Sequence, residues 1–157
     1  MNAEELKNTL KQGVLDGASQ EYKNRVHALA LHLNADRWLH EVAQQIEDGV
    51  YTVATDEMAD ELVAEYITEC LWAFNPHFVA KHCPDGIEEE HIKAMWGEGC
   101  GENCNEAFVA LVKAGNGMEK LIAEAKQLDG RGHFLSSYDG HEHEVTYNGT
   151  EYYIYKN

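Results

Sequence analysis

The sequence is short of basic side chains, of proline and of long apolar runs. Of its 157 residues, 12 are Lys or Arg and 28 are Asp or Glu, which gives a formal net charge of −16. Binding to a phosphate backbone needs clustered Lys and Arg, so direct contact with nucleic acid or with an anionic membrane is disfavoured. The partner that this charge fits is a protein with a basic surface.

Two further absences concern membranes and targeting. No run approaches the ~18 apolar residues that a membrane-spanning helix needs. The segment Met1–Lys7 lacks the basic and apolar regions of a signal peptide. We therefore expect a cytoplasmic protein with no membrane partner, in which the cysteines are reduced thiols. They are Cys70, Cys83, Cys100 and Cys104.

What the sequence does contain is helical periodicity over most of its length. The length and the 44% apolar fraction fit a single domain, residues 1–157. Within it we expect N-terminal helices over 1–50, a helical core over 55–128 and a β-meander over 133–157. The expected helices cover residues 4–12, 19–33, 36–49, 55–74, 76–82, 87–96, 102–114 and 118–128. Ser19 and Asp36 suit N-caps, and Val50–Ala54 suits a short strand or an extended link.

The apolar spacing changes to a period of two near the C-terminus. Asn148-Gly149 separates two alternating runs, which predicts a hairpin with a type I′ turn in which Tyr147 faces Thr150. This register places one set of side chains together on the face toward the helices. They are Val145, Tyr147, Tyr152 and Ile154.

A second turn is predicted at Asp139-Gly140, so that Phe134–Tyr138 pairs with His141–Val145. The expected sheet is then a three-stranded antiparallel meander. The predicted fold class is α+β, with an N-terminal helical bundle followed by a small C-terminal antiparallel β-meander.

Acidic residues concentrate in the middle of the chain, where residues 51–100 hold 11 acidic and 2 basic side chains. Four glutamates recur there at i, i+4 spacing, and each such like-charge pair costs roughly 0.2–0.5 kcal/mol. No Lys or Arg between Arg37 and Lys81 offsets this repulsion. Carboxylates repeating every ~6 Å can imitate a row of phosphates; the alternative is a solvated outer face. The candidate partner-binding residues are Asp56, Glu57, Asp60, Glu61, Glu65, Glu69, Glu88, Glu89 and Glu90.

The segment Asp129–Gly140 gathers polar side chains around glycines. An active or ligand-binding site can be built from it, with His133 as a base and Arg131 binding an anion. In the structural alternative, the glycines end a helix and shape turns, Arg131 pairs with Asp129 or Asp139, and His133 caps backbone groups. The candidate residues of this loop site are Asp129, Arg131, His133, Tyr138 and Asp139.

The evident metal-ligand patterns are weak. Cys100 and Cys104, with His82-Cys83, can supply four zinc ligands, but the spacing is not that of a zinc knuckle and Cys104 also suits a buried helix face. His141 and His143 share one face of a predicted strand without an identifiable third ligand. We expect no metal, no cofactor and no catalytic residue.

Several segments carry a resemblance to a known group. LWAFNPHFVAKH (Leu71–His82), DGRGHFLSSYDG (Asp129–Gly140) and the ending EYYIYKN are similar to small uncharacterised proteins of tailed bacteriophages, over roughly residues 66–157. In those proteins the stretch after the Asp-Gly turn is more acidic, whereas His141 and His143 interrupt it here. The resemblance implies a phage accessory protein made in the bacterial host cytosol, and it assigns no activity.

Charge and resemblance together favour a protein that is not an enzyme. The leading hypothesis is an anti-defence protein, anti-CRISPR or anti-restriction, that inhibits a host nucleic-acid-binding protein by acting as a DNA mimic. One alternative is a small enzyme or ligand-binding protein that uses the Arg131/His133 loop. Another is a phage assembly factor that oligomerises through its helical faces.

Overall fold

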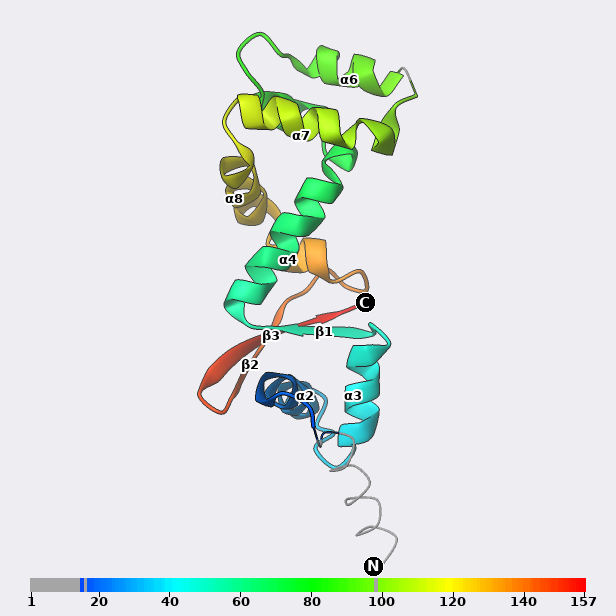
Figure 1. Cartoon of the computed structure of the whole chain (residues 1–157), viewed down its shortest axis with the longest axis vertical. Coiled ribbons are helices and arrows are strands. Elements are labelled where there is room, and N and C mark those ends of the chain that lie inside the picture. Colours follow the sequence, from blue (N-terminus) through cyan, green and yellow to red (C-terminus); the bar gives the residue numbers. More distant parts are fainter. Residues whose placement is uncertain (1–14, 16, 98) are drawn as a thin grey trace, which may run out of the picture. The chain divides into compact units, whose positions relative to one another are not determined.

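The computed structural model of the chain describes Leu15, residues 17–97 and residues 99–157, so the expected helix over 4–12 lies outside the described residues (Figure 1). The chain divides into two compact units. The first joins the residues up to Asp60 to Arg131–Asn157, and the second is the continuous segment Glu61–Gly130.

The fold is α+β, as predicted. The described helices are α2 (Gln20–His32), α3 (Leu39–Glu47), α4 (Asp56–Glu69), α5 (Pro76–His82), α6 (Glu89–Gly97), α7 (Asn105–Ala114), α8 (Met118–Asp129) and α9 (Arg131–Leu135). Two short 3₁₀ helices are η1 (Leu71–Ala73) and η2 (Gly101–Cys104), and the strands are β1 (Tyr51–Ala54), β2 (His143–Tyr147) and β3 (Thr150–Lys156). No helix in the described part of the chain is long and apolar enough to cross a membrane.

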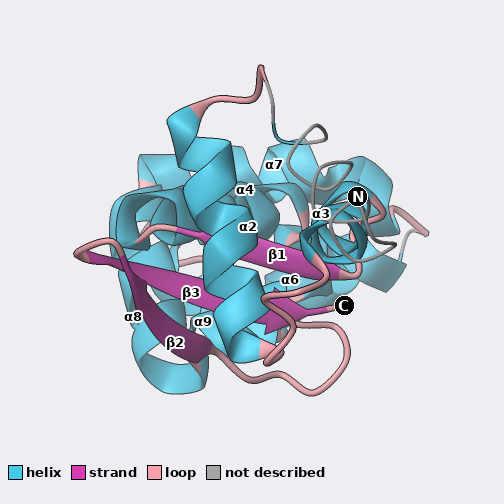
Figure 2. Cartoon of the chain, turned by 90° about the horizontal axis from the view of Figure 1, so that it is seen from below, coloured by secondary structure: helices cyan, strands magenta, loops and turns pink. Residues whose placement is uncertain are grey.

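The strands form one antiparallel sheet in the order β1-β3-β2 (Figure 2). The β2-β3 hairpin turns at Asn148-Gly149, whose φ values of 51° and 78° are the positive angles of a type I′ turn. Tyr147 pairs with Thr150, as predicted. β1 occupies the other side of β3, where Val53 lies opposite Ile154.

The predicted strand over Phe134–Tyr138 is wrong. The first part of this segment belongs to the helix α9, and the rest forms a turn. β3 already carries a strand on each side, so the segment does not pair along it and is hydrogen-bonded to Lys156 near its end. There, Ser136 Oγ and the Tyr138 backbone nitrogen lie 2.7 and 3.2 Å from the Lys156 carbonyl oxygen.

In the first unit, α2 and α3 pack on one face of the sheet (Figure 2). Ser19 caps α2 as predicted, its hydroxyl accepting a 3.2 Å hydrogen bond from the Tyr22 N–H. α3 begins after Trp38 without a side-chain cap, so the predicted cap at Asp36 is wrong. The predicted inward face of the hairpin does join the core, together with apolar residues of both helices. Buried members of this core include Val26, Leu29, Val42, Val53, Tyr152 and Ile154.

The second unit is helical. α4 contributes the buried side chains of Val63 and Ile67 to it, whereas the Tyr66 side chain is 44% exposed. The remaining core comes from the other helices of the unit and from η1. It includes Leu71, Val79, Ile92, Phe108, Val112 and Leu121, each at most 1% exposed.

Two of the four cysteines are paired. Cys100, which precedes η2, and Cys104, its last residue, form a disulfide with Cα atoms 5.2 Å apart, while Cys70 and Cys83 are free. The expectation of four reduced thiols is therefore wrong for this pair, whose spacing brings both sulfurs to one side of the turn. A disulfide also has no thiolate to give to the zinc site considered above. Among the described residues, no three His, Cys, Asp or Glu side chains are grouped to hold a metal ion.

Candidate functional site

The predicted row of glutamates is present on α4. Glu57, Glu61, Glu65 and Glu69 recur at one-turn intervals along the helix, and all four are exposed. Within the described part of the chain, no Lys, Arg or His side chain forms an ion pair with any of them. Their charges therefore face solvent without a local counter-charge.

Asp56 and Asp60 differ from this row because Arg131 contacts both. Arg131 Nη1 lies 2.8 Å from Asp56 Oδ1 and 3.3 Å from Asp60 Oδ1. No Lys or Arg between Arg37 and Lys81 offsets the repulsion, but a residue distant in the sequence supplies a counter-charge at the N-terminal end of α4. Arg131 lies 75 positions after Asp56 and 71 positions after Asp60, so no local sequence pattern reveals the contact.

Arg131 is held by two further elements. Its Nε and Nη2 donate to Oε2 and Oε1 of Glu142 at 2.8 and 3.1 Å, a bidentate pair. The Tyr153 ring lies 4.4 Å from its Cζ, and the Tyr155 hydroxyl donates to Glu142. Burial disfavours the charge, but the bonds to Glu142 and Asp56 outweigh it and raise the pKa of Arg131. Burial, followed by the bond to Glu142, raises the pKa of Tyr155.

Gly132 allows the chain to close around this cluster. It is buried, and a Cβ built on it would lie 2.5 Å from the Gly140 carbonyl oxygen and 2.8 Å from the Glu142 nitrogen. A larger residue would push Glu142 away from Arg131. The glycine-rich stretch is therefore explained by close backbone approach, together with Gly130, which ends α8 with φ 77°.

The contacts of Arg131 and His133 differ from those expected in the structural alternative for the loop. Arg131 pairs with Asp56, Asp60 and Glu142 rather than with a loop aspartate. His133 is exposed and packs edge-on against Phe134, with ring centroids 5.0 Å apart, instead of capping backbone groups. Carboxylates of the protein occupy the Arg131 guanidinium in this structure, so an anionic ligand would have to compete with them.

The other loop candidates also have structural contacts. Lys156 Nζ lies 3.8 Å from the centre of the exposed Tyr138 ring. Asp139 Oδ1 accepts the His141 N–H at 2.9 Å and lies 2.9 Å from Ser136 Oγ, and these bonds lower the pKa of Asp139. Asp129 is the exposed last residue of α8, in the second unit.

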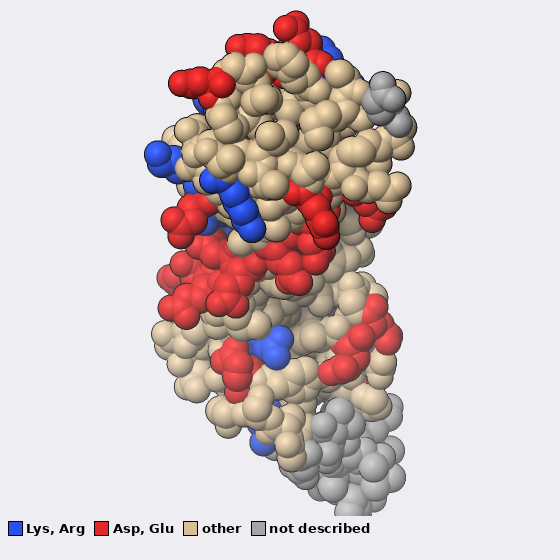
Figure 3. Space-filling model, turned by 45° about the horizontal axis from the view of Figure 1, so that its top comes forward, with Lys and Arg blue, Asp and Glu red and all other residues tan. Residues whose placement is uncertain are grey.

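The glutamates at the start of α6 form a separate group. α6 lies beyond α7 from α4 (Figure 1), so Glu88, Glu89 and Glu90 do not extend the α4 row. Glu89 is also engaged by Lys93 and by His77, and the hydrogen bond from Lys93 lowers the pKa of Glu89. On the face drawn in Figure 3, acidic side chains form several groups with few basic side chains among them.

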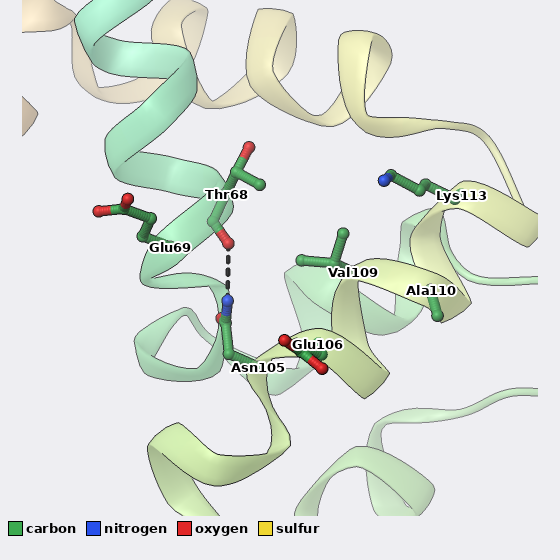
Figure 4. A pocket seen from close by; sticks show the side chains of 7 residues that line it. All are labelled: Thr68, Glu69, Asn105, Glu106, Val109, Ala110 and Lys113. Carbon is green, nitrogen blue, oxygen red and sulfur yellow. Dashed lines mark hydrogen bonds between the residues drawn. The ribbon is translucent and has the colours of Figure 1, made fainter.

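A groove beside the last turn of α4 is a feature that the sequence analysis missed. It has a volume of about 350 Å³ and a largely apolar surface, into which Val109 projects (Figure 4). Its lining comes from α4 and α7. The lining residues are Thr68, Glu69, Asn105, Glu106, Val109, Ala110 and Lys113.

Asn105 explains both the shape and the apolar character of this groove. Its side chain donates to the Thr68 carbonyl at 2.7 Å and accepts the Trp72 N–H at 3.1 Å, which holds the end of α4 against the start of α7. The polar atoms of the amide are therefore directed into the protein. The pairing joins residues 37 and 33 positions apart, so helical periodicity alone does not reveal it.

Comparison with known proteins adds no assignment: no protein-family model, no curated protein and no solved structure matches the chain.

Proposed function

We propose that the chain is a phage accessory protein that binds and inhibits a host nucleic-acid-binding defence protein, such as a restriction or CRISPR effector. It acts by occupying a basic surface of that protein rather than by catalysis. The observation that carries the proposal is the exposed row of Glu57, Glu61, Glu65 and Glu69, which has no basic partner among the described residues.

The spacing of the row suits a surface that normally holds phosphates. Successive carboxylates repeat every ~6 Å along a helix, and two steps of a nucleic-acid strand span ~6.8 Å. A protein groove that spaces Lys and Arg for phosphates can therefore meet several of these carboxylates at once. A net charge of −16 would also speed the approach of a basic partner.

The contacts of Arg131 define where the row begins. Asp56 and Asp60 are partly neutralised by the guanidinium, so Glu57 is the first α4 carboxylate that is fully available to a partner. The same contacts decide which loop residue can serve as a control. Substituting Arg131 would disturb α4 itself, whereas His133→Ala alters an exposed loop side chain and tests the loop separately.

The first experiment is a pulldown from host lysate at low and at high salt. A charge mimic captures basic nucleic-acid-binding proteins and releases them as the salt concentration rises. An enzyme built on the loop would capture little, and an assembly factor would capture itself or virion proteins.

The decisive variant replaces the four row glutamates by Gln, which keeps side-chain size and helix propensity. We expect equal or slightly higher stability, because like-charge pairs disappear. Association with the captured partner should slow, and its salt dependence should flatten. A control with the same change in net charge replaces Glu41, Glu102, Glu119 and Glu144, which are exposed and lie on other elements. If both variants bind the partner equally well, the row has no special role and the proposal is wrong.

A further inference from the structure

The groove between the last turn of α4 and α7 lies within the second unit and adjoins the C-terminal end of the glutamate row. Glu69 belongs both to the row and to the edge of the groove, and Glu106 stands at another edge (Figure 4). Both glutamates are exposed. An apolar surface thus lies directly beside negative charges that have no ion pair in the described part of the chain.

We propose that this groove receives one large apolar side chain, such as Phe, from a basic segment of the partner, whose neighbouring Lys or Arg side chains meet Glu69 and Glu106. This inference rests on the proposed function, since it gives the chemistry of the same partner. It adds a specific anchor to what is otherwise a general attraction between opposite charges.

Size and polarity suit such an anchor. Binding pockets for compact ligands begin at roughly 300 Å³, and the groove has about 350 Å³. Its surface is largely apolar, Val109 and Ala110 are among its lining residues, and the Asn105 amide is hydrogen-bonded to backbone groups of the protein. An apolar contact surrounded by polar groups is the usual arrangement at the energetic centre of a protein interface.

Lys113 gives the groove a direction. Its side chain lies at the end of the groove that is farther from Glu106 (Figure 4). Among the described residues, no acidic side chain forms an ion pair with it. A segment that is basic on both sides of its anchor would meet repulsion from the ammonium group. The fitting segment is therefore basic on the side toward the glutamates and neutral or acidic on the other.

The test uses the full chain and two fluorescein-labelled peptides. Both peptides carry the same run of Lys on one side of a central position and uncharged residues on the other, and they differ only in having Phe or Ser at that position. Binding is followed by fluorescence anisotropy at low ionic strength. Partial burial of one Phe ring should make the Phe peptide bind about tenfold more tightly.

A pair of matched variants locates the effect. Ala110 lines the groove and is exposed, so Ala110→Trp fills the groove without opening the core and should remove the preference for Phe. Ala107 is also exposed on α7 but does not line the groove, so Ala107→Trp should keep the preference. Equal binding of the two peptides by the parent chain, or a preference for Phe that survives in Ala110→Trp, would overturn the proposal.

Failure of the groove proposal and failure of the proposed function would give different results in these measurements. The ratio of the two peptide affinities reports on the groove alone, because both peptides have the same charge. Binding of the Ser peptide by the four-Gln variant reports on the glutamate row. Loss of the Phe preference with a retained charge effect would reject only the groove, and the opposite pattern would reject only the row.

Discussion

At Arg131, a guanidinium that can recognise a ligand instead binds carboxylates of the protein itself. It is 13% exposed and makes charge-assisted hydrogen bonds to Glu142, Asp56 and Asp60, so removing it leaves three carboxylates close together without their cation. The loss of one partner from a buried ion pair is much more costly than the loss of an exposed pair.

We expect Arg131→Gln to lower the free energy of unfolding by about 1–2 kcal/mol, less than for a fully buried pair, because its carboxylate partners are 29–69% exposed and water screens them. Arg131→Lys should lower it by less, because Lys keeps the charge but cannot form the two parallel bonds to Glu142. Urea unfolding measures both changes. Lys120→Gln, at an exposed position, should stay within about 0.5 kcal/mol of the parent. An Arg131→Gln variant as stable as this control would show that the cluster does not stabilise the fold.

His32 makes the stability of the protein depend on pH. His32 of α2 faces His143 of β2, with ring centroids 4.9 Å apart. Burial, followed by repulsion from His143, lowers the pKa of His32 from its ordinary value of 6.5. Because the folded pKa is the lower one, the unfolded chain binds more protons just below pH 6.5. His32 therefore contributes a loss of stability as the pH falls from that value towards the folded pKa.

An NMR titration of the imidazole signals measures the pKa of His32 directly. We expect His143→Asn to raise this pKa only part of the way to 6.5, because the burial of His32 remains. His133→Asn, which removes an exposed histidine of α9, serves as the control and should leave it unchanged. A His32 pKa that does not respond to His143→Asn would contradict repulsion between the two rings.

Among the elements, Asn105 connects two helices through hydrogen bonds to backbone atoms. Asn105→Ala leaves the Thr68 carbonyl and the Trp72 N–H without their partners, and we expect it to lower the free energy of unfolding by about 1–3 kcal/mol. Asn105→Asp should also destabilise, because it keeps the acceptor for Trp72 but turns a carboxylate oxygen toward the Thr68 carbonyl. Thermal or urea unfolding measures both variants.

The control for this prediction is Asn103→Ala, an exposed substitution on η2, for which we expect a change within about 0.5 kcal/mol. If Asn105→Ala behaves like Asn103→Ala, then contacts other than the amide hold α4 against α7. In that case the shape of the groove depends on apolar packing alone.

The helices are the elements that the sequence predicts well, because their signals are local. Ser19 caps α2, and Asn75 caps α5 by accepting the His77 N–H at 2.9 Å, directly before Pro76. The segment Phe134–Tyr138 shows the limit of such signals. Its short alternation fits a strand, but both sides of β3 are occupied, and the chain forms a helical turn instead.

Over the whole molecule, the features that escape prediction are contacts between distant segments. Val50–Ala54 is compatible with a strand, yet nothing nearby indicates that it joins β3 rather than forming a link. The Asn157 side chain reaches Thr52 Oγ1 at 3.1 Å across 105 positions of the chain. The cluster around Arg131 and the groove beside Asn105 depend on the same kind of long-range pairing. The charged row on α4 is predictable because it lies on one helix.

The pairing of β1 with β3 also determines the order in which the protein can assemble during synthesis. β3 leaves the ribosome after all of Glu61–Gly130, roughly 5–20 s after β1 at ordinary elongation rates. The continuous second unit can therefore fold while β1 still lacks a neighbour for its backbone groups. A truncation or fusion that hinders Thr150–Lys156 should consequently harm α2 and α3, although helices of the second unit lie nearer to it in the chain.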